Sequence, residues 1–547
     1  MGDKNPDVKK IALTLSKMNS IKLGNIGSLV SFNSESYEMT TERDVEVVVE
    51  NGCIIDIGKK LGDADSFIDC GNNLVTPGFV DSHTHPVFVD TREEEFAMRV
   101  SGLSYQEIQK RGGGILKSTK LLREASESLL ISKVKSRMDT FLSLGTTTVE
   151  CKSGYGLDTV SELKSLKVID KVNKKHEIDM IPTFMGGHDF PIDFQNDKDA
   201  YVDLICNTMI PKVAKQGIAK FNDVFCEPGY FNIEQSKRIL ETGEKYGLHS
   251  RMHCDEFSCF GASKLAAKLK VNSADHLMEI DKEGMDRLAQ ENIIGTLLPG
   301  TTFFLGMKKY APYLELKNKG VEIGIASDYN SGSCNIQSMP FIITLSCIYL
   351  KMNILDALKA STIIPSKSLR IDDSVGSIEK GKIADILVWG IPDLKHIPFS
   401  INQPNINLVL KKGKPVFTAW FTRRTLRTFN TKFNLFSVKK YLHHILILFF
   451  LYWSPLYGNY AFKKKVKEVC RSYRISVESS QLELGKSEVV ITMESGRNNF
   501  EMYMLVGFAS AGQAIAHQKE MNLSNAYAPL MVSLNVAVPA SRNEFNT

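Results

Sequence analysis

From residue 76 to residue 371 the sequence repeats one pattern: a short apolar segment, a loop with polar residues, and a stretch with helical periodicity. This alternation is typical of parallel β/α architecture, because parallel strands need a crossover connection that is usually a helix. Helical stretches at 161–174, 234–246 and 261–269 fall between apolar segments. Eight segments fit buried strands, namely 75–80, 146–151, 180–184, 223–226, 249–253, 274–276, 293–298 and 321–326. Eight strands predict a (β/α)8 barrel of the TIM type.

Short strands separated by Gly and Asn turns flank this region on both sides. Before it, residues 1–75 contain apolar or alternating segments such as 45–49 and 53–57, which are typical of strands. After it, residues 372–420 return to short strands between glycines. We therefore expect the two flanks to join in one small composite β domain beside a barrel that spans 76–371.

The net charge of +5 comes from one part of the chain. Fourteen Lys or Arg and no acidic residue lie between 395 and 467, and the rest has 53 basic against 62 acidic residues, a balance of −9. This mildly acidic remainder gives no electrostatic basis for binding nucleic acid. The ten cysteines form no C-x-x-C pair, which favours reduced thiols and a cytoplasmic location for the first 420 residues.

The character of the sequence changes after residue 420. Residues 421–461 form a basic linker that includes nine consecutive apolar residues, 445–453. This run is too short for a spanning helix of about 20 residues, but basic, apolar and small residues follow one another as in a signal peptide. Membrane contact is expected only if the segment 441–457 is used. Residues 462–547 are predicted to be a small β-rich module of unknown function.

Two explanations of this C-terminal extension stay open. One is a fused open reading frame or a gene-model error. The other is a genuine membrane anchor that carries a small exported module. The apolar run motivates both, and a barrel that folds before such a segment leaves the ribosome makes the second physically awkward.

A His-x-His motif gives the strongest indication of chemistry. In the sequence Pro77-Gly-Phe-Val-Asp-Ser-His-Thr-His-Pro, strand alternation places His83 and His85 on one face at the end of the first predicted barrel strand. Two imidazoles in that arrangement can reach one divalent cation. Active sites of such barrels lie at the carboxyl ends of the strands, so this position favours a metal site over a structural pair.

The other predicted strand ends carry polar or ionisable residues as well. Five of the eleven histidines lie at or just beyond strand ends, although these ends are a small part of the chain. This clustering favours an active site over unrelated structural histidines. The residues concerned are His83, His85, Lys152, Tyr155, His188, Glu227, His253, Glu256, His276 and Asp328.

These motifs resemble the amidohydrolase superfamily and, within it, the imidazolonepropionase family, over about residues 20–420. The first motif is shared across the superfamily, whereas Lys-Ser-Gly-Tyr-Gly-Leu and Asp-x-Asn-x-Gly-Ser are specific to this branch. The matching segments are Pro77-Gly-Phe-Val-Asp-Ser-His-Thr-His-Pro, Glu150-Cys-Lys-Ser-Gly-Tyr-Gly-Leu, Thr183-Phe-Met-Gly-Gly-His, His253-Cys-Asp-Glu, Ser273-Ala-Asp-His-Leu, Ser327-Asp-Tyr-Asn-Ser-Gly-Ser and Gly376-Ser-Ile-Glu-Lys-Gly-Lys-Ile-Ala-Asp.

The resemblance implies a metal-dependent hydrolase that opens the ring of 4-imidazolone-5-propanoate to N-formimidoyl-L-glutamate in histidine degradation. It implies one divalent or trivalent ion, Zn or Fe, and a homodimer. The implied metal ligands are His83, His85, His253 and Asp328. The implied substrate-binding residues are Arg92, Tyr155, His188, Glu256, Asn330, Gly332 and Ser333. Glu256, His276 and Asp328 match the catalytic positions, and which of them is the general base stays open.

These residue types suit the chemistry. A cyclic amide is a poor electrophile, so its hydrolysis needs a metal that lowers the pKa of water. A carboxylate or imidazole can then accept or return the proton. A planar guanidinium such as that of Arg92 suits a propionate, because its fork makes two parallel charge-assisted hydrogen bonds.

Structural alternatives exist for several of these residues. Arg92 lies in an acidic stretch and could form a surface salt bridge, Tyr155 could cap a loop, and Gly332 could only form a turn. Lys152 is expected to be structural or supporting, since the resemblance favours one metal. Ser331 stands where the family often has Pro, and the family does not have residues 421–547.

Two hypotheses compete with the one preferred here. The first is another amidohydrolase that acts on a related ring, such as a deaminase or a cyclic amidase, and Arg92, Tyr155 and Asn330 argue against it. The second is a membrane-tethered barrel without catalytic activity. The complete set of four metal ligands argues against the second.

Overall fold

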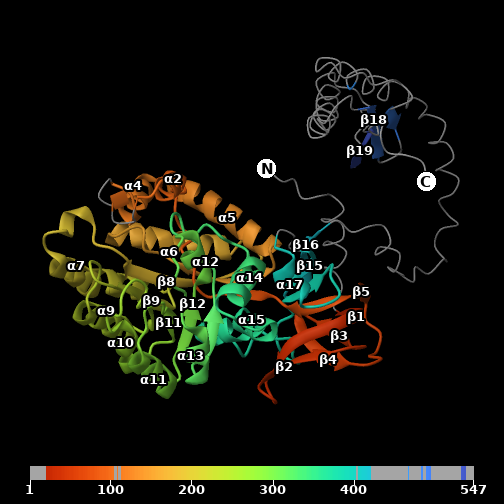
Figure 1. Ribbon diagram of the computed structural model, residues 1–547, viewed down its shortest axis with the longest axis horizontal. Coiled ribbons are helices and arrows are strands. Elements are labelled where there is room, and N and C mark those ends of the chain that lie inside the picture. Colours follow the sequence, from red (N-terminus) through yellow and green to blue (C-terminus); the bar gives the residue numbers. More distant parts are fainter. Residues whose placement is uncertain are drawn as a thin grey trace, which may run out of the picture. The chain divides into compact units, whose positions relative to one another are not determined.

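The chain forms two compact units, 1–430 and 431–547. The computed structural model describes residues 20–103, 107–108, 112–401 and 405–419 of the first unit (Figure 1). In the second unit it describes Val466 and the segments 482–484, 488–494 and 531–537. The segment 441–457 lies outside the described residues.

The region predicted to be a barrel contains a sheet of eight strands, and each described pair of neighbours is parallel. The strands follow one another in chain order from β6 to β13, so the (β/α)8 fold is confirmed. Their bounds are β6 Phe79–Asp81, β7 Thr146–Lys152, β8 Asp179–Gly187, β9 Phe221–Cys226, β10 His249–Cys254, β11 Ser273–His276, β12 Ile294–Leu297 and β13 Ile323–Ile325.

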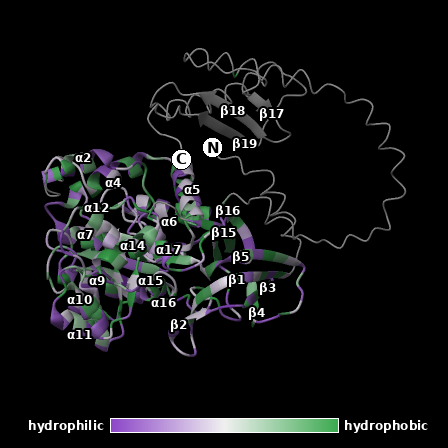
Figure 2. Ribbon diagram, turned by 45° about the vertical axis from the view of Figure 1, so that its right-hand side comes forward, coloured by the Kyte–Doolittle hydropathy of each residue, from purple (hydrophilic) through white to green (hydrophobic). Residues whose placement is uncertain are grey.

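Helices surround this sheet, and hydrophobic and hydrophilic residues alternate along them (Figure 2). In α9, for example, Ile239 and Leu240 are buried while the acidic and basic residues face outward, as expected of an amphipathic helix. The helices are α2 Glu93–Val100, α4 Ile115–Glu124, α5 Glu127–Ser143, α6 Thr159–Asn173, η1 Ile192–Phe194, α7 Lys198–Leu204, η2 Ile205–Met209, α8 Ile210–Gln216, α9 Ile233–Lys245, α10 Ala262–Leu269, α11 Lys282–Gln290, α12 Pro299–Phe304, α13 Tyr313–Asn318, α14 Met339–Tyr349, α15 Ile354–Ala360, α16 Ile363–Ser368 and α17 His396–Phe399.

Local sequence signals explain where several barrel helices begin. Asp158 accepts a hydrogen bond from the backbone N–H of Ser161 at the start of α6. Asn232 and Gln235 form a reciprocal capping box at the start of α9. Such caps satisfy backbone donors that have no partner within the helix. The predicted helices at 161–174, 234–246 and 261–269 agree with α6, α9 and α10 to within two residues.

The two ends of the barrel sheet meet at the loops that follow β6 and β13. The backbone N–H of Asp328 donates to the carbonyl of His83 at 3.0 Å, and that of His85 donates to the carbonyl of Tyr329 at 2.8 Å. The backbone N–H of Ser327 also donates to Asp81 Oδ1. The seam of the barrel therefore consists of hydrogen bonds between two loops that carry predicted metal ligands.

A second sheet, called the small sheet below because it belongs to the small composite β domain, combines strands from both flanks of the barrel. Its order is β16-β15-β14-β5-β1-β3-β4, and β2 pairs with β1. Its buried core is largely aliphatic. The strands are β1 Ser20–Asn33, β2 Glu38–Glu42, β3 Glu46–Glu50, β4 Cys53–Gly58, β5 Ser66–Pro77, β14 Ile386–Trp389, β15 Ile406–Lys411 and β16 Lys414–Thr418.

The strand predicted at 75–80 is wrong in its bounds, because the chain changes sheets within it. Residues up to Pro77 belong to β5, and the barrel strand β6 begins at Phe79. Between them, the backbone N–H of Gly78 donates to Asp385 of the small sheet, whereas that of Phe79 donates to Gly145 beside β7. A Cβ on Gly78 would lie 2.4 Å from Thr147 Oγ1, so the crossing needs glycine.

In the C-terminal unit, three strands form a sheet of their own: β17 Leu482–Leu484, β18 Glu488–Glu494 and β19 Met531–Ala537. β18 pairs antiparallel with β17 and parallel with β19. All three strands lie within 462–547, the part of the chain predicted to be β-rich. Among the described residues, no helix combines the length and apolarity that a membrane crossing needs.

Candidate active site

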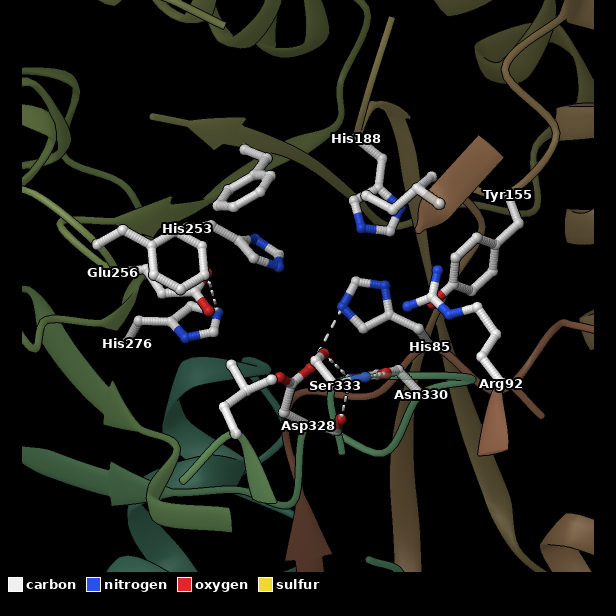
Figure 3. A pocket seen from close by; sticks show the side chains of 14 residues that line it. His85, Arg92, Tyr155, His188, His253, Glu256, His276, Asp328, Asn330 and Ser333 are labelled. Atoms are coloured by element: carbon white, nitrogen blue, oxygen red, sulfur yellow. Dashed lines mark hydrogen bonds and ion pairs between the residues drawn. The ribbon is translucent and has the colours of Figure 1, made fainter. Parts of the chain in front are cut away.

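Most of the predicted site residues meet in one pocket at the carboxyl end of the barrel strands, whereas His83 and Gly332 do not line it. Figure 3 shows His85, His188, His253 and Asp328 around this pocket, with Arg92 and Tyr155 along one side. The pocket and its open mouth contain about 480 Å³ of empty space. It is lined by His85, Arg92, Ile115, Tyr155, His188, Phe225, His253, Glu256, Phe257, His276, Leu305, Asp328, Asn330 and Ser333.

Three histidines form a group that can hold a metal ion. Ring nitrogens of His83, His85 and His253 all lie within 4.8 Å of one another, and all three residues are buried. Asp328 Oδ1 lies 3.6 Å from His83 Nε2 and 3.5 Å from His85 Nε2. His83 Nε2 and Asp328 Oδ1 are buried without a hydrogen-bond partner. Buried polar atoms without partners are costly, so this donor set fits a cation.

Carboxylates behind the histidines fix the direction in which two of them point. Asp275 Oδ2 lies 2.7 Å from His83 Nδ1, and Asp223 Oδ1 lies 3.0 Å from His253 Nδ1. An Nδ1–H that donates to a carboxylate leaves the Nε2 lone pair free for a metal, the arrangement that is typical of ligating histidines. Burial lowers the pKa of His83 and His85 well below the usual value, which keeps both rings neutral and able to coordinate.

Asp328 stands on a loop with a strained backbone. Its φ of 52° lies in the left-handed region, which non-glycine residues rarely adopt and which is often found at functional sites. Thr301 donates a hydrogen bond to Asp328 Oδ2, and the Asn330 side chain donates to the Asp328 carbonyl. Asn330 Oδ1 also accepts backbone N–H groups of Gly332 and Ser333. Asn330 therefore organises the loop from Asp328 to Ser333.

Glu256 and His276 form a second polar group in the pocket. Glu256 Oε2 lies 3.5 Å from His276 Nε2, and His276 Nδ1 is buried without a hydrogen-bond partner. Burial, together with the charges of Asp328 and Glu227, raises the pKa of Glu256 well above its usual value. Burial also lowers the pKa of His276. Glu256 thus favours its protonated form and His276 its neutral form, so the pair can pass a proton.

Arg92 is buried, with 4% of its surface exposed, so it is not a surface salt bridge. Its Nε lies 3.5 Å from Glu95 Oε2, and its Nη1 is buried without a hydrogen-bond partner. Gly332 makes room for it, because a Cβ there would lie 2.0 Å from Arg92 Nη2. A buried guanidinium with a free donor at the pocket wall can bind a carboxylate.

His188 and Tyr155 lie beside Arg92 and His85. The rings of His85 and His188 stack with centroids 4.9 Å apart, and the rings of Tyr155 and His188 are 5.2 Å apart. His188 Nδ1 lies 2.8 Å from the carbonyl of Gly154, so its Nε2 is the nitrogen left for a ligand. Burial lowers the pKa of His188 to about 3.

Several charged residues behind the pocket were not identified from the sequence. Asp223, Arg251 and Asp275 lie on β9, β10 and β11 and are fully buried. Each is a charged residue inside a predicted buried strand, and such a residue needs a partner. A charged residue within an apolar strand was therefore the feature of the sequence that could have identified these three residues. Lys152, expected to be structural or supporting, is fully buried and ion-paired with Asp223 and Glu150.

The fold resembles that of solved hydrolases at low sequence identity. An adenosine deaminase from Xanthomonas campestris with bound zinc has a TM-score of 0.55 and 15% identity, and the match covers 72% of this chain and 92% of that chain. A triazine hydrolase variant has a TM-score of 0.57 and 15% identity, with 73% and 95% covered. At such identities the likeness concerns the fold alone.

Sequence comparisons are more specific. Residues 275–416 match the amidohydrolase family. An imidazolonepropionase from Alkaliphilus metalliredigens is 40% identical over 371 residues, which are 68% of this chain and 88% of that protein. One from Clostridium tetani is 38% identical over 393 residues, with 71% and 94% covered. With this identity over most of the length of its relatives, the chain belongs to the imidazolonepropionase family of amidohydrolases.

Proposed function

We propose that this chain hydrolyses the cyclic amide of 4-imidazolone-5-propanoate to N-formimidoyl-L-glutamate. As an amidohydrolase it acts on a carbon–nitrogen bond. One observation carries the proposed substrate: a single pocket holds both a cation-binding donor set and the buried, partly unpartnered guanidinium of Arg92. A small anionic substrate with a hydrolysable ring needs both features at once.

The proposed ligands of one Zn or Fe ion are His83, His85, His253 and Asp328, because both metals accept imidazole and carboxylate donors. When bound, such an ion lowers the pKa of water and polarises a carbonyl oxygen. The chain's contribution is to direct Nε2 of His83 and His253 into the pocket through Asp275 and Asp223.

Substrate binding is assigned to the wall that carries Arg92. Its guanidinium would hold the propionate through paired charge-assisted hydrogen bonds, and Gly332 leaves the space that this side chain needs. Tyr155 and His188 lie next to Arg92 and would contact the ring or its substituent. Asn330, Gly332 and Ser333 would shape the pocket from the loop after β13.

Proton transfer is assigned to three residues. Asp328 faces the space between the histidines and would accept a proton from the attacking water. Glu256 favours its protonated form because of burial, so it can donate a hydrogen bond to the substrate carbonyl or a proton to the leaving ring nitrogen. His276, 3.5 Å from Glu256, would relay that proton.

The test uses the full chain loaded with Zn²⁺ or Fe²⁺. We expect formimidoylglutamate to form from 4-imidazolone-5-propanoate, detected by mass spectrometry as the addition of one water. The His253→Ala variant, checked for folding by circular dichroism, should form none. Turnover of a related ring by the folded, metal-loaded chain, with none of this substrate, would contradict the proposal and favour a deaminase or another cyclic amidase.

The family resemblance also supports a cytoplasmic homodimer, which light scattering of the purified chain would test. For the C-terminal extension, expression of the full chain and fractionation of the cells separate the two explanations. A stable soluble species of 61.1 kDa, without a membrane-bound or cleaved product, would contradict a membrane anchor. Removal of residues 421–547 with retained turnover would show that the extension is dispensable for catalysis.

A further inference from the structure

Lys152 occupies an unusual position beneath the candidate metal site. It ends β7, its side chain is fully buried, and it does not line the pocket. Its Nζ lies 2.9 Å from Glu150 Oε1 and 2.7 Å from Asp223 Oδ2. One ammonium thus stands between two buried carboxylates that belong to different strands, β7 and β9.

Asp223 connects Lys152 to one of the proposed metal ligands, His253. While its Oδ2 contacts Lys152, its Oδ1 lies 3.0 Å from His253 Nδ1. The two oxygens of one carboxylate are therefore shared between the ammonium and the imidazole. This sharing fixes both the rotation of the carboxylate and the direction of the His253 ring.

Glu150 connects Lys152 to the segment that carries the other two histidines. Its Oε2 accepts a hydrogen bond from the backbone N–H of Thr84 at 3.1 Å, and Thr84 stands between His83 and His85. The backbone N–H of Lys152 donates to the Thr84 carbonyl at 3.0 Å. Lys152 thus supports the His-x-His segment through its backbone directly and through its ammonium by way of Glu150.

We propose that Lys152 is a positioning residue whose ammonium holds the His83–His85 segment and His253 at the spacing that one metal ion requires. The inference rests on the ligand set of the proposed function. Without the ammonium, Glu150 and Asp223 would be two uncompensated buried carboxylates, and their repulsion would move the groups that they hold. The carboxylate behind His83, Asp275, is itself paired with another cation, Arg251, so the hydrogen-bonded connection from Lys152 to the His83 segment runs through Thr84.

The chain contains a matched control for this residue. Lys411 is also fully buried and also lies between two carboxylates, Asp385 and Asp179, but it belongs to β15 of the small sheet. Lys152→Met and Lys411→Met each remove a buried ammonium and keep an unbranched side chain. Both variants should lower the melting temperature, whereas only a positioning role predicts a difference in metal affinity.

The experiment measures the Kd of the full chain for Zn²⁺ by competition with a chromophoric chelator. We expect Lys152→Met to raise this Kd by roughly 10–100-fold, the usual effect of losing a group that orients a ligand. Lys411→Met should stay within about twofold of the unmodified chain, as distant sites do. Unchanged zinc affinity in Lys152→Met, or an equal loss in both variants, would overturn the inference.

A second approach combines Lys152→Met with a change in its partner Asp223. Asp223→Asn keeps an oxygen that can accept a hydrogen bond from His253, but the neutral amide carries no charge for the ammonium of Lys152 to compensate. This variant should therefore weaken Zn²⁺ binding while the chain still folds. Adding Lys152→Met to Asp223→Asn should then weaken binding less than it does alone, because the contact with Asp223 is already lost and only the one with Glu150 remains to be removed. Fully additive losses would overturn the inference. Failure of the unmodified chain to bind Zn²⁺ would instead contradict the ligand set and the proposed function.

Discussion

The carboxyl end of the barrel and the small sheet differ in whether their buried polar side-chain atoms have hydrogen-bond partners. In the described part of the small sheet, Ser66 Oγ is the only buried side-chain polar atom without a partner. At the barrel end, atoms of His83, His85, His276 and Asp328 all lack one. Because unpaired buried groups cost stability, the barrel end is arranged for a ligand, whereas the small sheet is arranged for stability.

This difference predicts that substitutions in the two regions separate activity from stability. Changes in the site residues Arg92, Asp328 and Gly332 at the barrel end should impair turnover with little loss of stability, since active sites are seldom optimised for folding. Changes in the small sheet should do the reverse. The following variants test the contrast, from the largest expected effect to the smallest.

Asp328→Asn should lower kcat/KM by at least about a thousandfold, or about 4 kcal/mol, because it removes a proposed ligand and proton acceptor. In the metal-free chain the melting temperature should not fall, since an amide is less costly to bury than a carboxylate whose pKa burial has already raised to about 6. Steady-state kinetics and calorimetry measure the two effects. A lower melting temperature with retained turnover would reverse the assignment of this region.

Lys411→Met should lower the free energy of unfolding by about 3 kcal/mol, because it leaves Asp385 buried without its cation. Chemical denaturation of the full chain measures this loss. KM and kcat should match those of the unmodified enzyme at a temperature where both are folded. A large change in KM would show that the small sheet contributes to the active site.

Arg92→Lys should raise KM by about 10–100-fold, because an ammonium cannot make the paired hydrogen bonds of a guanidinium. Zn²⁺ affinity should not change, since Arg92 contacts none of the proposed ligands among the contacts described. Initial rates over a range of substrate concentrations provide the measurement. An unchanged KM would remove Arg92 from the substrate site.

Gly332→Ala should raise KM by about tenfold, because the added Cβ would lie 2.0 Å from Arg92 Nη2 and would displace the guanidinium. The matched control is Gly62→Ala in the part of the chain before β5, where a Cβ would meet no atom within 4 Å. That control should behave like the unmodified enzyme. Equal KM values in both variants would mean that Gly332 only forms a turn.

Asp179→Asn should have the smallest effect, about 1 kcal/mol of stability at neutral pH. Burial raises the pKa of Asp179, but the ion pairs with Lys411 and Lys412 outweigh it and hold the pKa below the usual value. A lowered pKa means that the ionised carboxylate stabilises the fold above about pH 4, and that this contribution is lost as the pH falls further. The difference in melting temperature between the two proteins should therefore shrink from pH 6 to pH 3, and a constant difference would contradict this.

The strand–helix alternation was sufficient to predict the barrel, because apolar parallel strands and amphipathic helices are local patterns. The change of sheets at Gly78 could not be predicted, since it depends on whether Asp385 or Gly145 accepts the next hydrogen bond. Both acceptors are remote in sequence. Periodicity carries no information about such partners.

The residues of the candidate site likewise fall into those that the sequence could predict and those that it could not. Its polar pocket-lining residues follow strand ends or belong to motifs, so the sequence identified them as a group. The apolar ones, which carry no such signal, were missed, namely Ile115, Phe225, Phe257 and Leu305. The supporting residues Asp223, Asp275 and Arg251 lie within strands, and their roles depend on which neighbour each faces across the sheet. The environment of Arg92 was equally hidden, because the space beside Gly332 exists only after the loop has folded.

The seam of the barrel has a consequence for folding. The segments that close it, around Asp81 and Ser327, are 246 residues apart in the chain. A growing polypeptide cannot form this contact until almost all of the barrel has been synthesised, and contacts between such distant residues form slowly. The ligands His83 and Asp328 lie on the two sides of the same seam. A bound ion would therefore link the two segments whose contact forms last during folding. Without the ion, this seam would be the first part of the barrel to open.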